Sequence, residues 1–237
     1  MTDSTTRPSR PGLAPAPNLI TAIVDVHADD GAYDLGVFAA SGGVALVHKL
    51  SEGGDFNDRD VAHAMDAAAK AGLLRALYHF GNATDAEHQA DHFLERAAPY
   101  PDALLVLDCE ANSKPRFGTM TADIARAFVL RVREKTGRMP VFYSFTSFLR
   151  GLRLSRGDVL GSCPLWQAQY GERPTAPASP AWDRIDLWQY TNGTEGPHDQ
   201  ARYPRKVAGF ARAAQDRSAF EGTADELRAW WRTAGGP

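Results

Sequence analysis

Cysteine is scarce in this sequence, and its scarcity excludes one class of protein. Only two cysteines, Cys109 and Cys163, occur among 237 residues, too few to hold together a small domain built on disulfides. Cys109 lies within a predicted strand, where a small buried thiol is the ordinary expectation. The sequence offers no support for a bond between the two.

Long apolar runs and an excess of one charge are missing as well. No apolar stretch approaches the ~20 residues that cross a bilayer, so we expect no transmembrane segment. The 26 basic and 29 acidic residues leave a net charge of -3, which provides no concentrated positive face for nucleic acid. Hydrophobic residues make up 43% and charged residues 23% of the chain, as in ordinary globular proteins. We expect a monomer.

A secretory signal is also absent from the N-terminal segment. The first 18 residues contain four prolines and two arginines but no apolar core of a signal peptide. We expect residues 1–18 to form a disordered, proline-rich leader. Residues 19–237 are then expected to form a single domain, and export from the cytoplasm would need another route.

From Leu19 onward, short aliphatic runs alternate with segments of helical pattern. The runs cover residues 19–26, 44–48, 73–80, 103–108 and 139–145, and we expect each to be a strand. The connections are too long for hairpins, which favours parallel pairing through right-handed crossovers, with about five βα units before Ser147.

Four helices are signalled by caps, stops and apolar spacing. The first helix is expected over residues 61–72, after Asp58 or Asp60 as the cap and with Gly72 as the stop, and the second over residues 88–98, after a capping box of Thr84 and Glu87. The third is indicated by an apolar stripe of Ile124, Phe128 and Val132 that ends near Gly137. The fourth begins at Thr223 with Glu226 and carries Leu227, Trp230 and Trp231.

Beyond Ser147 the helical pattern fades. Residues 163–170 and 185–193 have the pattern of strands, and the proline-rich loop between them leaves no room for a crossover helix. We therefore expect antiparallel or irregular pairing in this part of the domain.

The most informative stretch is LLVLDCEAN, residues 104–112. A buried strand there runs into Asp108 and Glu110, although a buried ionised group costs several kcal/mol or shifts its pKa until it is neutral. Residues two apart on a strand project to the same side, with Cα atoms roughly 6.5 Å apart. Both carboxylates can face one ligand at the carboxyl end of the strand, while Cys109 faces the helices.

Other predicted strands end in polar or aromatic residues at the same rim. These residues are Asp25 and His27 after the first run, Lys49 and Glu52 after the second, and Tyr78 and His79 after the third. Singly, each has an ordinary structural explanation: Asp25 could cap a helix and His79 could be a satisfied core histidine. Their shared position favours a common site.

Two carboxylates in a cleft with aromatic side chains suit glycoside hydrolysis. One protonated carboxylic acid donates its proton to the leaving glycosidic oxygen, and an ionised partner stabilises the positive charge that develops on the sugar ring. Aromatic rings also suit the apolar faces of sugars. The aromatic candidates are Trp166, Tyr170, Trp188 and Tyr190, although at alternating strand positions such residues are at least as often plain core.

From about Leu19 to Gly222 the sequence resembles the glycoside hydrolase family 25 muramidases. The matching segments, in order, are DVHADD from Asp25, KLSEG from Lys49, AGLLRALYHF with QADHFL, LVLDCE, GRMPVFYS, PLWQAQY, LWQYT and DRSAFEG from Asp216. Each match alone is weak, and their common order makes the resemblance specific.

The resemblance implies an α/β fold: a flattened TIM-like barrel of about five βα units followed by about three strands with little helix. It implies Glu110 as general acid/base, Asp108 as its partner, either orienting the substrate's acetamido group or acting as nucleophile, and Asp25 and Asp216 as flanking acids. The implied reaction cuts the β-1,4 bond between N-acetylmuramic acid and N-acetylglucosamine in bacterial peptidoglycan, with retention. The protein would act on the cell wall, extracellular or periplasmic, without a cofactor or metal. The residues expected to bind substrate are Tyr78, Trp166, Tyr170, Trp188, Gln189 and Lys49.

The sequence departs from the family pattern at two positions. The family's histidine after the first aspartate is one position early, as His27, which on a strand points it to the opposite face. Its asparagine near the end is Ser218, and the segment before Asp216 is long, which could reshape the rim of the cleft.

Two other functions remain open from the sequence. His88 and His92 lie four apart on a predicted helix, as zinc ligands do, but the acid of the zinc-protease pattern is absent and a solvated helix face explains them better. The rim acids could also bind Mg²⁺ or Ca²⁺. Alternatively, the chain is a non-catalytic glycan-binding barrel, against which the four clustered, mutually repelling acids argue.

Overall fold

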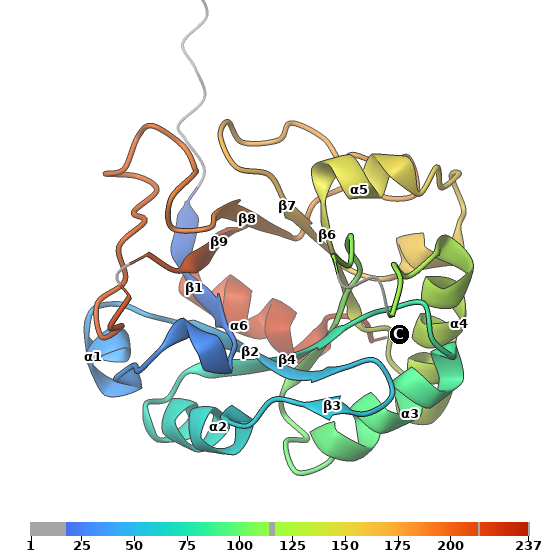
Figure 1. The fold of residues 1–237 in the computed structure, drawn as a ribbon. Coiled ribbons are helices and arrows are strands. Elements are labelled where there is room, and N and C mark those ends of the chain that lie inside the picture. Colours follow the sequence, from blue (N-terminus) through green and yellow to red (C-terminus); the bar gives the residue numbers. More distant parts are fainter. Residues whose placement is uncertain (1–17, 114–116, 213, 237) are drawn as a thin grey trace, which may run out of the picture.

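The structure, a computed structural model, describes residues 18–113, 117–212 and 214–236. Within these residues one sheet has the strand order β1-β9-β8-β7-β6-β5-β4-β2-β3, and β1 also pairs with β2, which closes the sheet into a barrel (Figure 1). The predicted α/β barrel is confirmed. The expected leader lies outside the described residues apart from Asn18.

The barrel is built from eight strands, and a ninth, short strand extends from β2. The described strands are β1 (Leu19–Val26), β2 (Ala45–Glu52), β3 (Phe56–Asn57), β4 (Leu74–Phe80), β5 (Leu104–Asp108), β6 (Val141–Phe145), β7 (Leu165–Ala168), β8 (Leu187–Thr191) and β9 (Asp216–Glu221). Every neighbouring pair from β1 round to β8 is parallel, whereas β9 pairs antiparallel with both β8 and β1.

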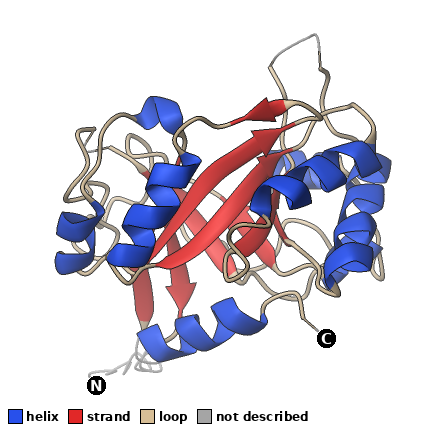
Figure 2. Cartoon of the chain, turned by 90° about the horizontal axis from the view of Figure 1, so that it is seen from below, coloured by secondary structure: helices blue, strands red, loops and turns tan. Residues whose placement is uncertain are grey.

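Helices cover the outside of the strands (Figure 2). The helices are α1 (Leu35–Ala40), α2 (Val61–Lys70), α3 (Ala86–Ala97), α4 (Ala122–Thr136), α5 (Thr146–Gly151) and α6 (Ala224–Thr233), with short 3-10 turns η1 (Ala28–Asp30) and η2 (Val159–Ser162). The strands β1, β2, β4, β5 and β6 are each followed by one of α1 to α5, which gives the βα units that the sequence predicted.

Parallel pairing continues two strands further than we expected, to β7 and β8, whereas β9 pairs antiparallel as expected for this part of the domain. β7 and β8 are parallel, so the prediction of antiparallel or irregular pairing there was wrong. The loop between β7 and β8 contains no helix, and two hydrogen bonds hold it against residues Cys163 and Gln167. Ala178 donates its N–H to Oε1 of Gln167, and the indole N–H of Trp182 donates to the carbonyl of Cys163.

Two predicted helix boundaries are confirmed. The hydroxyl of Thr121 caps α4, which ends at Gly137 in the left-handed conformation (φ 73°) that glycine adopts without strain. In α6, Thr223 and Glu226 form the predicted capping box.

The predicted capping box of α3 was wrong by one residue. Asp85, not Thr84, accepts the N–H of His88 at the start of the helix. Thr84 instead donates its hydroxyl to Oδ1 of Asn82. Asp60 precedes α2, as expected for one of two candidates, but its side chain makes no capping hydrogen bond.

The core has an outer and an inner layer, separated by the sheet. The outer layer packs the helices on the strands and contains Phe93, Phe128 and both cysteines, Cys109 and Cys163, which are buried free thiols. The two faces of each strand therefore serve different layers, as the strand period of two requires.

The inner layer fills the barrel and is closed at one end by α6. Leu227 and Trp231 of α6 pack against residues at the beginnings of the parallel strands, such as Ala45 and Leu104. The indole N–H of Trp231 also donates to the carbonyl of Arg75 (2.8 Å). Figure 1 shows α6 behind the opening of the barrel. The opposite end, where the parallel strands finish, remains available for a site.

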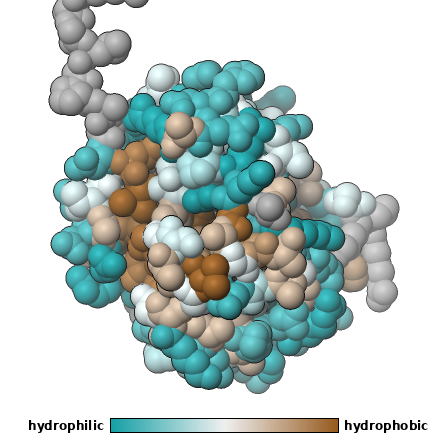
Figure 3. Space-filling view, turned by 90° about the vertical axis from the view of Figure 1, so that its left-hand side faces the viewer, coloured by the Kyte–Doolittle hydropathy of each residue, from teal (hydrophilic) through white to brown (hydrophobic). Residues whose placement is uncertain are grey.

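The face of the molecule that carries α1 is polar over much of its area (Figure 3). On the side that carries α1, Figure 3 shows a largely hydrophilic surface with apolar residues in a few separate patches. Within the described part of the chain, none of the helices combines the length and apolar character needed to cross a bilayer.

Candidate active site

A cavity of about 280 Å³ lies at the carboxyl ends of the parallel strands. It is lined by Asp25, His27, Lys49, Tyr78, Phe80, Val106, Asp108, Glu110, Tyr143, Trp166 and Asp216. Four carboxylates from three distant segments of the sequence thus meet at the edge of the barrel where function is expected.

The end of β5 directs two of these carboxylates into the cavity. Cys109 donates its N–H to the carbonyl of Tyr143 (3.0 Å), which continues the pairing with β6 beyond Asp108. The thiol of Cys109 is buried in the outer layer. Because side chains alternate, Asp108 and Glu110 both face inward, as the sequence predicted.

The other two carboxylates come from adjacent strands. Asp25 of β1 and Asp216 of β9 are directly paired residues of the antiparallel ladder. At such paired positions the side chains project to the same face and lie close together. The closing strand β9 therefore places Asp216 beside Asp25.

Gln189 holds Asp25 in place from behind the cavity wall. Its Nε2 donates to both carboxylate oxygens of Asp25 (2.9 and 3.2 Å). Its Oε1 accepts the hydroxyls of Tyr143 and Tyr170, each at 2.9 Å. Gln189 is itself 1% exposed, so its orientation is fixed by four hydrogen bonds rather than by solvent.

Burial raises the pKa values of all four acids, and repulsion by other acids raises three of them further, those of Asp25, Asp108 and Asp216. Desolvation is the largest cause in each case, because the ionised form loses water. The charge of Asp216 further raises the pKa of Asp25, and that of Glu110 raises the pKa of Asp108. The pKa of Asp216 rises to about 7. The cluster therefore keeps protons at pH values where free carboxyl groups have lost them.

Lys49 opposes this effect on the β5 pair. Its positive charge lowers the pKa of both Asp108 and Glu110, although burial still raises them on balance. The Lys49 ammonium also pairs with Glu52 at 2.8 Å.

Asp108 has one oxygen that the protein leaves unused. Its Oδ1 is buried and finds no hydrogen-bond donor among the described residues. A buried acceptor without a donor is costly, and functional sites are where such a cost is tolerated. A ligand N–H or O–H group in the cavity could supply the missing bond.

Aromatic side chains complete the cavity wall. Trp166, 2% exposed, packs edge-on against Tyr143 with ring centroids 4.8 Å apart. Its indole N–H donates to the hydroxyl of Ser218 (2.9 Å), the residue at the position of the family's asparagine. Tyr78 lies on the neighbouring side, and its pKa is raised by burial and by Asp108.

The remaining residues expected to bind substrate do not line the cavity. Tyr170 and Gln189 lie behind Asp25 in the network described above. Trp188 lies on the opposite face of β8, where it packs with Tyr190 and Tyr203. Because Gln189 faces inward, the neighbouring Trp188 faces outward, and we do not carry it into the proposed site.

His79 and His27, both predicted to lie at the rim of the barrel, have different surroundings. His79 is fully buried, bonds Ser51 and lies near Gln89 and Phe128, and burial lowers its pKa to about 3. It is a neutral core residue. His27, expected to point away, lines the cavity. The reason is that β1 ends at Val26, so strand alternation no longer determines its direction.

Sequence reasoning missed three lining residues, Phe80, Val106 and Tyr143. Tyr143 lies within an apolar strand and gave no signal of its own. Its register provides one: Tyr143 is the partner of Asp108 on β6, and Phe80 is the partner of Asp108 on β4. Neighbours of an acid at a strand end are thus candidates for the same site.

The structure supplies little for a metal ion. In the described segments, no group of three or more histidine, cysteine or acidic side chains is placed to hold one. His92, half of the suspected zinc pair, instead lies 3.3 Å from the carbonyl of Phe56.

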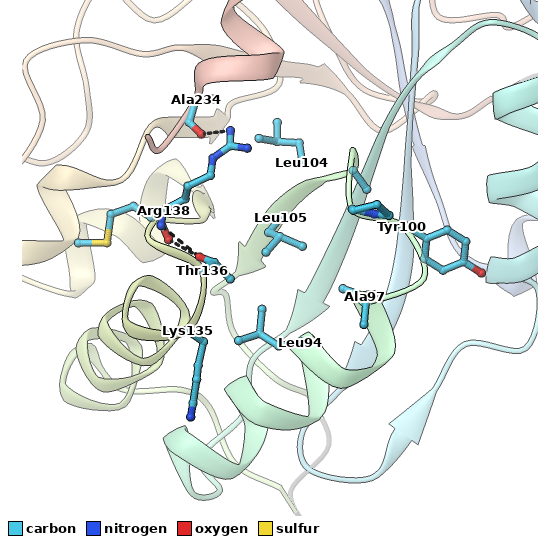
Figure 4. A pocket seen from close by; sticks show the side chains of 13 residues that line it. Leu94, Ala97, Tyr100, Leu104, Leu105, Lys135, Thr136, Arg138 and Ala234 are labelled. Atoms are coloured by element: carbon cyan, nitrogen blue, oxygen red, sulfur yellow. Dashed lines mark hydrogen bonds between the residues drawn. The ribbon is translucent and has the colours of Figure 1, made fainter. Parts of the chain in front are cut away.

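A larger pocket, of about 410 Å³, lies at the end of the barrel where β5 begins (Figure 4). It is lined mainly by apolar residues of α3 and β5, such as Leu94 and Leu105, with Lys135 and Arg138 beside them. Arg138 is engaged by the carbonyl of Ala234 (2.7 Å). None of its described lining residues is a carboxylate, so this pocket lacks the paired acids that glycoside hydrolysis uses.

Known proteins resemble this chain in sequence. It is 25% identical over 178 residues to the autolytic lysozyme of Clostridium acetobutylicum, a match covering 74% of this chain and 53% of that protein. It is 27% identical over 187 residues to lysozyme M1 of Streptomyces globisporus, covering 71% of this chain and 63% of the relative. The chain thus spans between half and two thirds of the length of these relatives.

Solved structures show the same fold. The bacterial lysozyme from Streptomyces coelicolor aligns with a TM-score of 0.70 at 23% identity, over 93% of this chain and 99% of that one. The family GH25 lysozyme from Aspergillus fumigatus also aligns with a TM-score of 0.70 at 23% identity, over 93% and 100% of the two chains. These likenesses confirm the flattened TIM-like barrel.

The family itself is identified by a sequence model. Residues 24–198 match the model described as glycosyl hydrolases family 25, which covers most of the chain and confirms the resemblance carried by the ordered motifs. The protein therefore belongs to glycosyl hydrolase family 25.

Proposed function

We propose that the protein is an N-acetylmuramidase that hydrolyses the β-1,4 bond between N-acetylmuramic acid and N-acetylglucosamine in peptidoglycan, with retention of configuration. One observation carries the proposal: Asp108 and Glu110 line a single cavity with two further carboxylates at the open end of the barrel. The relatives named as lysozymes support the same substrate class.

Glu110 serves as the general acid and then as the general base. Burial raises its pKa, so Glu110 keeps its proton to a higher pH than a free carboxyl group does. In the first step Glu110 donates this proton to the departing glycosidic oxygen. In the second, its carboxylate accepts a proton from the attacking water.

Asp108 stabilises the developing positive charge and orients the substrate. Burial and the neighbouring Glu110 raise its pKa, so it competes for the proton of the pair. An acetamido N–H of the substrate would supply the donor that Oδ1 lacks. That bond favours ionised Asp108 and leaves the proton on Glu110.

The attacking group is then either the substrate's acetamido oxygen or Asp108 itself. We favour the acetamido oxygen, because an Asp108 engaged with the acetamido N–H is placed to orient that group. Both routes retain the anomeric configuration. Asp25, fixed by Gln189, and Asp216 flank the reacting sugar, and Trp166 and Tyr78 provide aromatic surface for it.

The remaining features of the proposal follow from the substrate. Peptidoglycan lies outside the cytoplasm, so the protein would act on the cell wall, in an extracellular or periplasmic setting. We propose that it does so as a monomeric single domain. Neither proton transfer nor attack in this mechanism requires a metal or cofactor.

Product analysis tests the proposal. Purified peptidoglycan is digested, the new reducing ends are labelled by borohydride reduction, and the labelled sugar is identified. The initial anomeric form is followed separately by ¹H NMR of the unreduced product before mutarotation. We expect N-acetylmuramic acid released as the β-anomer. New ends on N-acetylglucosamine would contradict the bond assignment, and the α-anomer would contradict retention.

Two variants separate catalysis from binding. Asp108→Asn should lower kcat by about 10²-fold or more while the variant still binds glycan. Asp66→Asn, at an exposed position of α2, is the matched control and should behave as the wild type. Wild-type protein that binds glycan without releasing products would identify a non-catalytic glycan-binding barrel instead.

A further inference from the structure

A side groove opens beside the catalytic cavity. It has a volume of about 450 Å³ and lies between η1 and the short strand β3. His27 and Lys49 line both the cavity and the groove, so the two spaces share a wall. A substituent of a sugar held in the cavity can therefore extend into the groove.

Arg59 spans the two sides of this groove. Its Nη2 donates to Oδ1 of Asp29 (2.9 Å) and to the carbonyl of Ala28 (3.3 Å). The side chain is 69% exposed, and within the described residues its Nε and Nη1 make no hydrogen bond. Two guanidinium donors are thus available to a ligand.

The nearest buried acid serves a structural role. Asp58 is 5% exposed, and its two oxygens accept the N–H groups of Ala28 and Asp60 (3.0 and 2.9 Å). These bonds tie η1 to the beginning of α2 and hold the walls of the groove in place. The ion pair with Asp29 partly balances the positive charge of Arg59, and the exposed remainder of the guanidinium lines the groove.

The opposite wall of the groove is apolar. Phe56 is 46% exposed, which is unusual for a phenylalanine in this chain. The Lys49 ammonium lies 5.1 Å from the centroid of the Phe56 ring and 5.2 Å from that of Phe80. A ligand in the groove therefore meets an aromatic surface on one side and a cation on the other.

We propose that this groove binds the peptide stem carried by N-acetylmuramic acid, with Arg59 pairing with a carboxylate of the stem. The inference rests on the proposed function and adds to it a determinant of specificity. The glycan strand is neutral apart from its lactyl groups, so further sugars have little use for a guanidinium. A stem peptide carries carboxylates that match the donors of Arg59 and aliphatic side chains that match Phe56.

A pair of substrates tests the inference. One is a peptidoglycan tetrasaccharide that carries its peptide stems. The other is the same tetrasaccharide after an amidase has removed the stems and the freed lactyl carboxylates have been capped as neutral methylamides. KM and kcat are measured on both for the wild type and for Arg59→Ala. We expect the ratio of KM without stems to KM with stems to exceed one in the wild type and to fall about fivefold in the variant.

Charge variants and a matched control sharpen the test. Arg59→Lys should restore part of the preference, and Arg59→Glu should lower it further, because it repels the stem. Arg156 forms an equally exposed pair with Asp183 (3.0 Å) but lines neither space, so Arg156→Ala should keep the wild-type ratio.

Each other outcome overturns the inference. An unchanged ratio in Arg59→Ala, with KM unchanged on both substrates, would show that the groove binds nothing. An equal rise of KM on both would show that Arg59 contacts the glycan. Wild-type protein that cleaves neither substrate would refute the proposed function itself, a result distinct from the other two.

Discussion

Replacing Gln189 by leucine is expected to destabilise the protein and impair the site together. The substitution keeps the approximate volume of the side chain but removes four hydrogen bonds, to Asp25, Tyr143 and Tyr170. The groups that lose these hydrogen bonds are wholly or partly buried.

The magnitude follows from the number of partners left unsatisfied. Each buried polar group without a partner costs about 1–3 kcal/mol. Tyr170 is half-buried and can turn toward water, whereas Tyr143 is 8% exposed. Tyr143 is stranded in full, whereas Asp25 is half-buried at the cavity and only partly shielded from water, so we expect a loss of roughly 1–4 kcal/mol against the ~5–15 kcal/mol that stabilises a typical domain.

The loss should also depend on pH. Gln189 lowers the pKa of Asp25, which burial and Asp216 already raise, so its removal raises that pKa further. Protonation relieves the stranded carboxylate, so the destabilisation should be smaller at pH 4 than at pH 8.

Urea unfolding measures both effects. Gln200→Leu, at an exposed position, is the control and should change the free energy of unfolding by less than about 0.5 kcal/mol. A loss below ~1 kcal/mol in Gln189→Leu at pH 8, or the same loss at both pH values, would refute the reasoning.

Three further predictions concern charge and packing. The pKa of Asp216 is raised from 3.8 to about 7, so the folded state retains a proton that the unfolded state releases, and stability is lost as pH rises through that window. Asp216→Asn should flatten the fall in urea stability between pH 4 and pH 8, and an unchanged slope would contradict it. Lys49 lowers the pKa of Glu110, so Lys49→Met should move the alkaline limb of the kcat/KM profile to higher pH. A shift of that limb to lower pH would contradict the prediction. Trp231 is 3% exposed, so Trp231→Ala should cost about 3–5 kcal/mol in urea unfolding. Trp230→Ala, at a half-buried position, should cost less, and equal losses would argue against α6 as the closure of the barrel.

Much of the fold could be predicted because each βα unit carries its own signals. Aliphatic strands, helix caps and stops such as Gly137 are local in sequence, and parallel pairing follows from the length of the connections. The pairing of β7 with β8 could not be predicted in this way. Its loop is fixed by long-range bonds from Gln167 and Trp182, which no local pattern reveals.

The candidate site was predictable to the extent that strand alternation determines it. Asp108 and Glu110 share a face for that reason alone. Alternation does not say which face turns inward, however, so the segment containing Trp188 and Gln189 offered both as candidates. Only the register of the closed barrel directs Gln189 to Asp25 and Trp188 to the outside.

The most direct test of the account concerns the proton of Glu110. Glu110→Gln keeps the shape of the side chain but cannot donate that proton, and release of reducing ends from purified peptidoglycan measures the effect. We expect a loss of at least about 10²-fold in kcat with an intact fold by circular dichroism, and wild-type activity in the exposed control Glu87→Gln. Activity of Glu110→Gln within about threefold of the wild type would contradict the central claim.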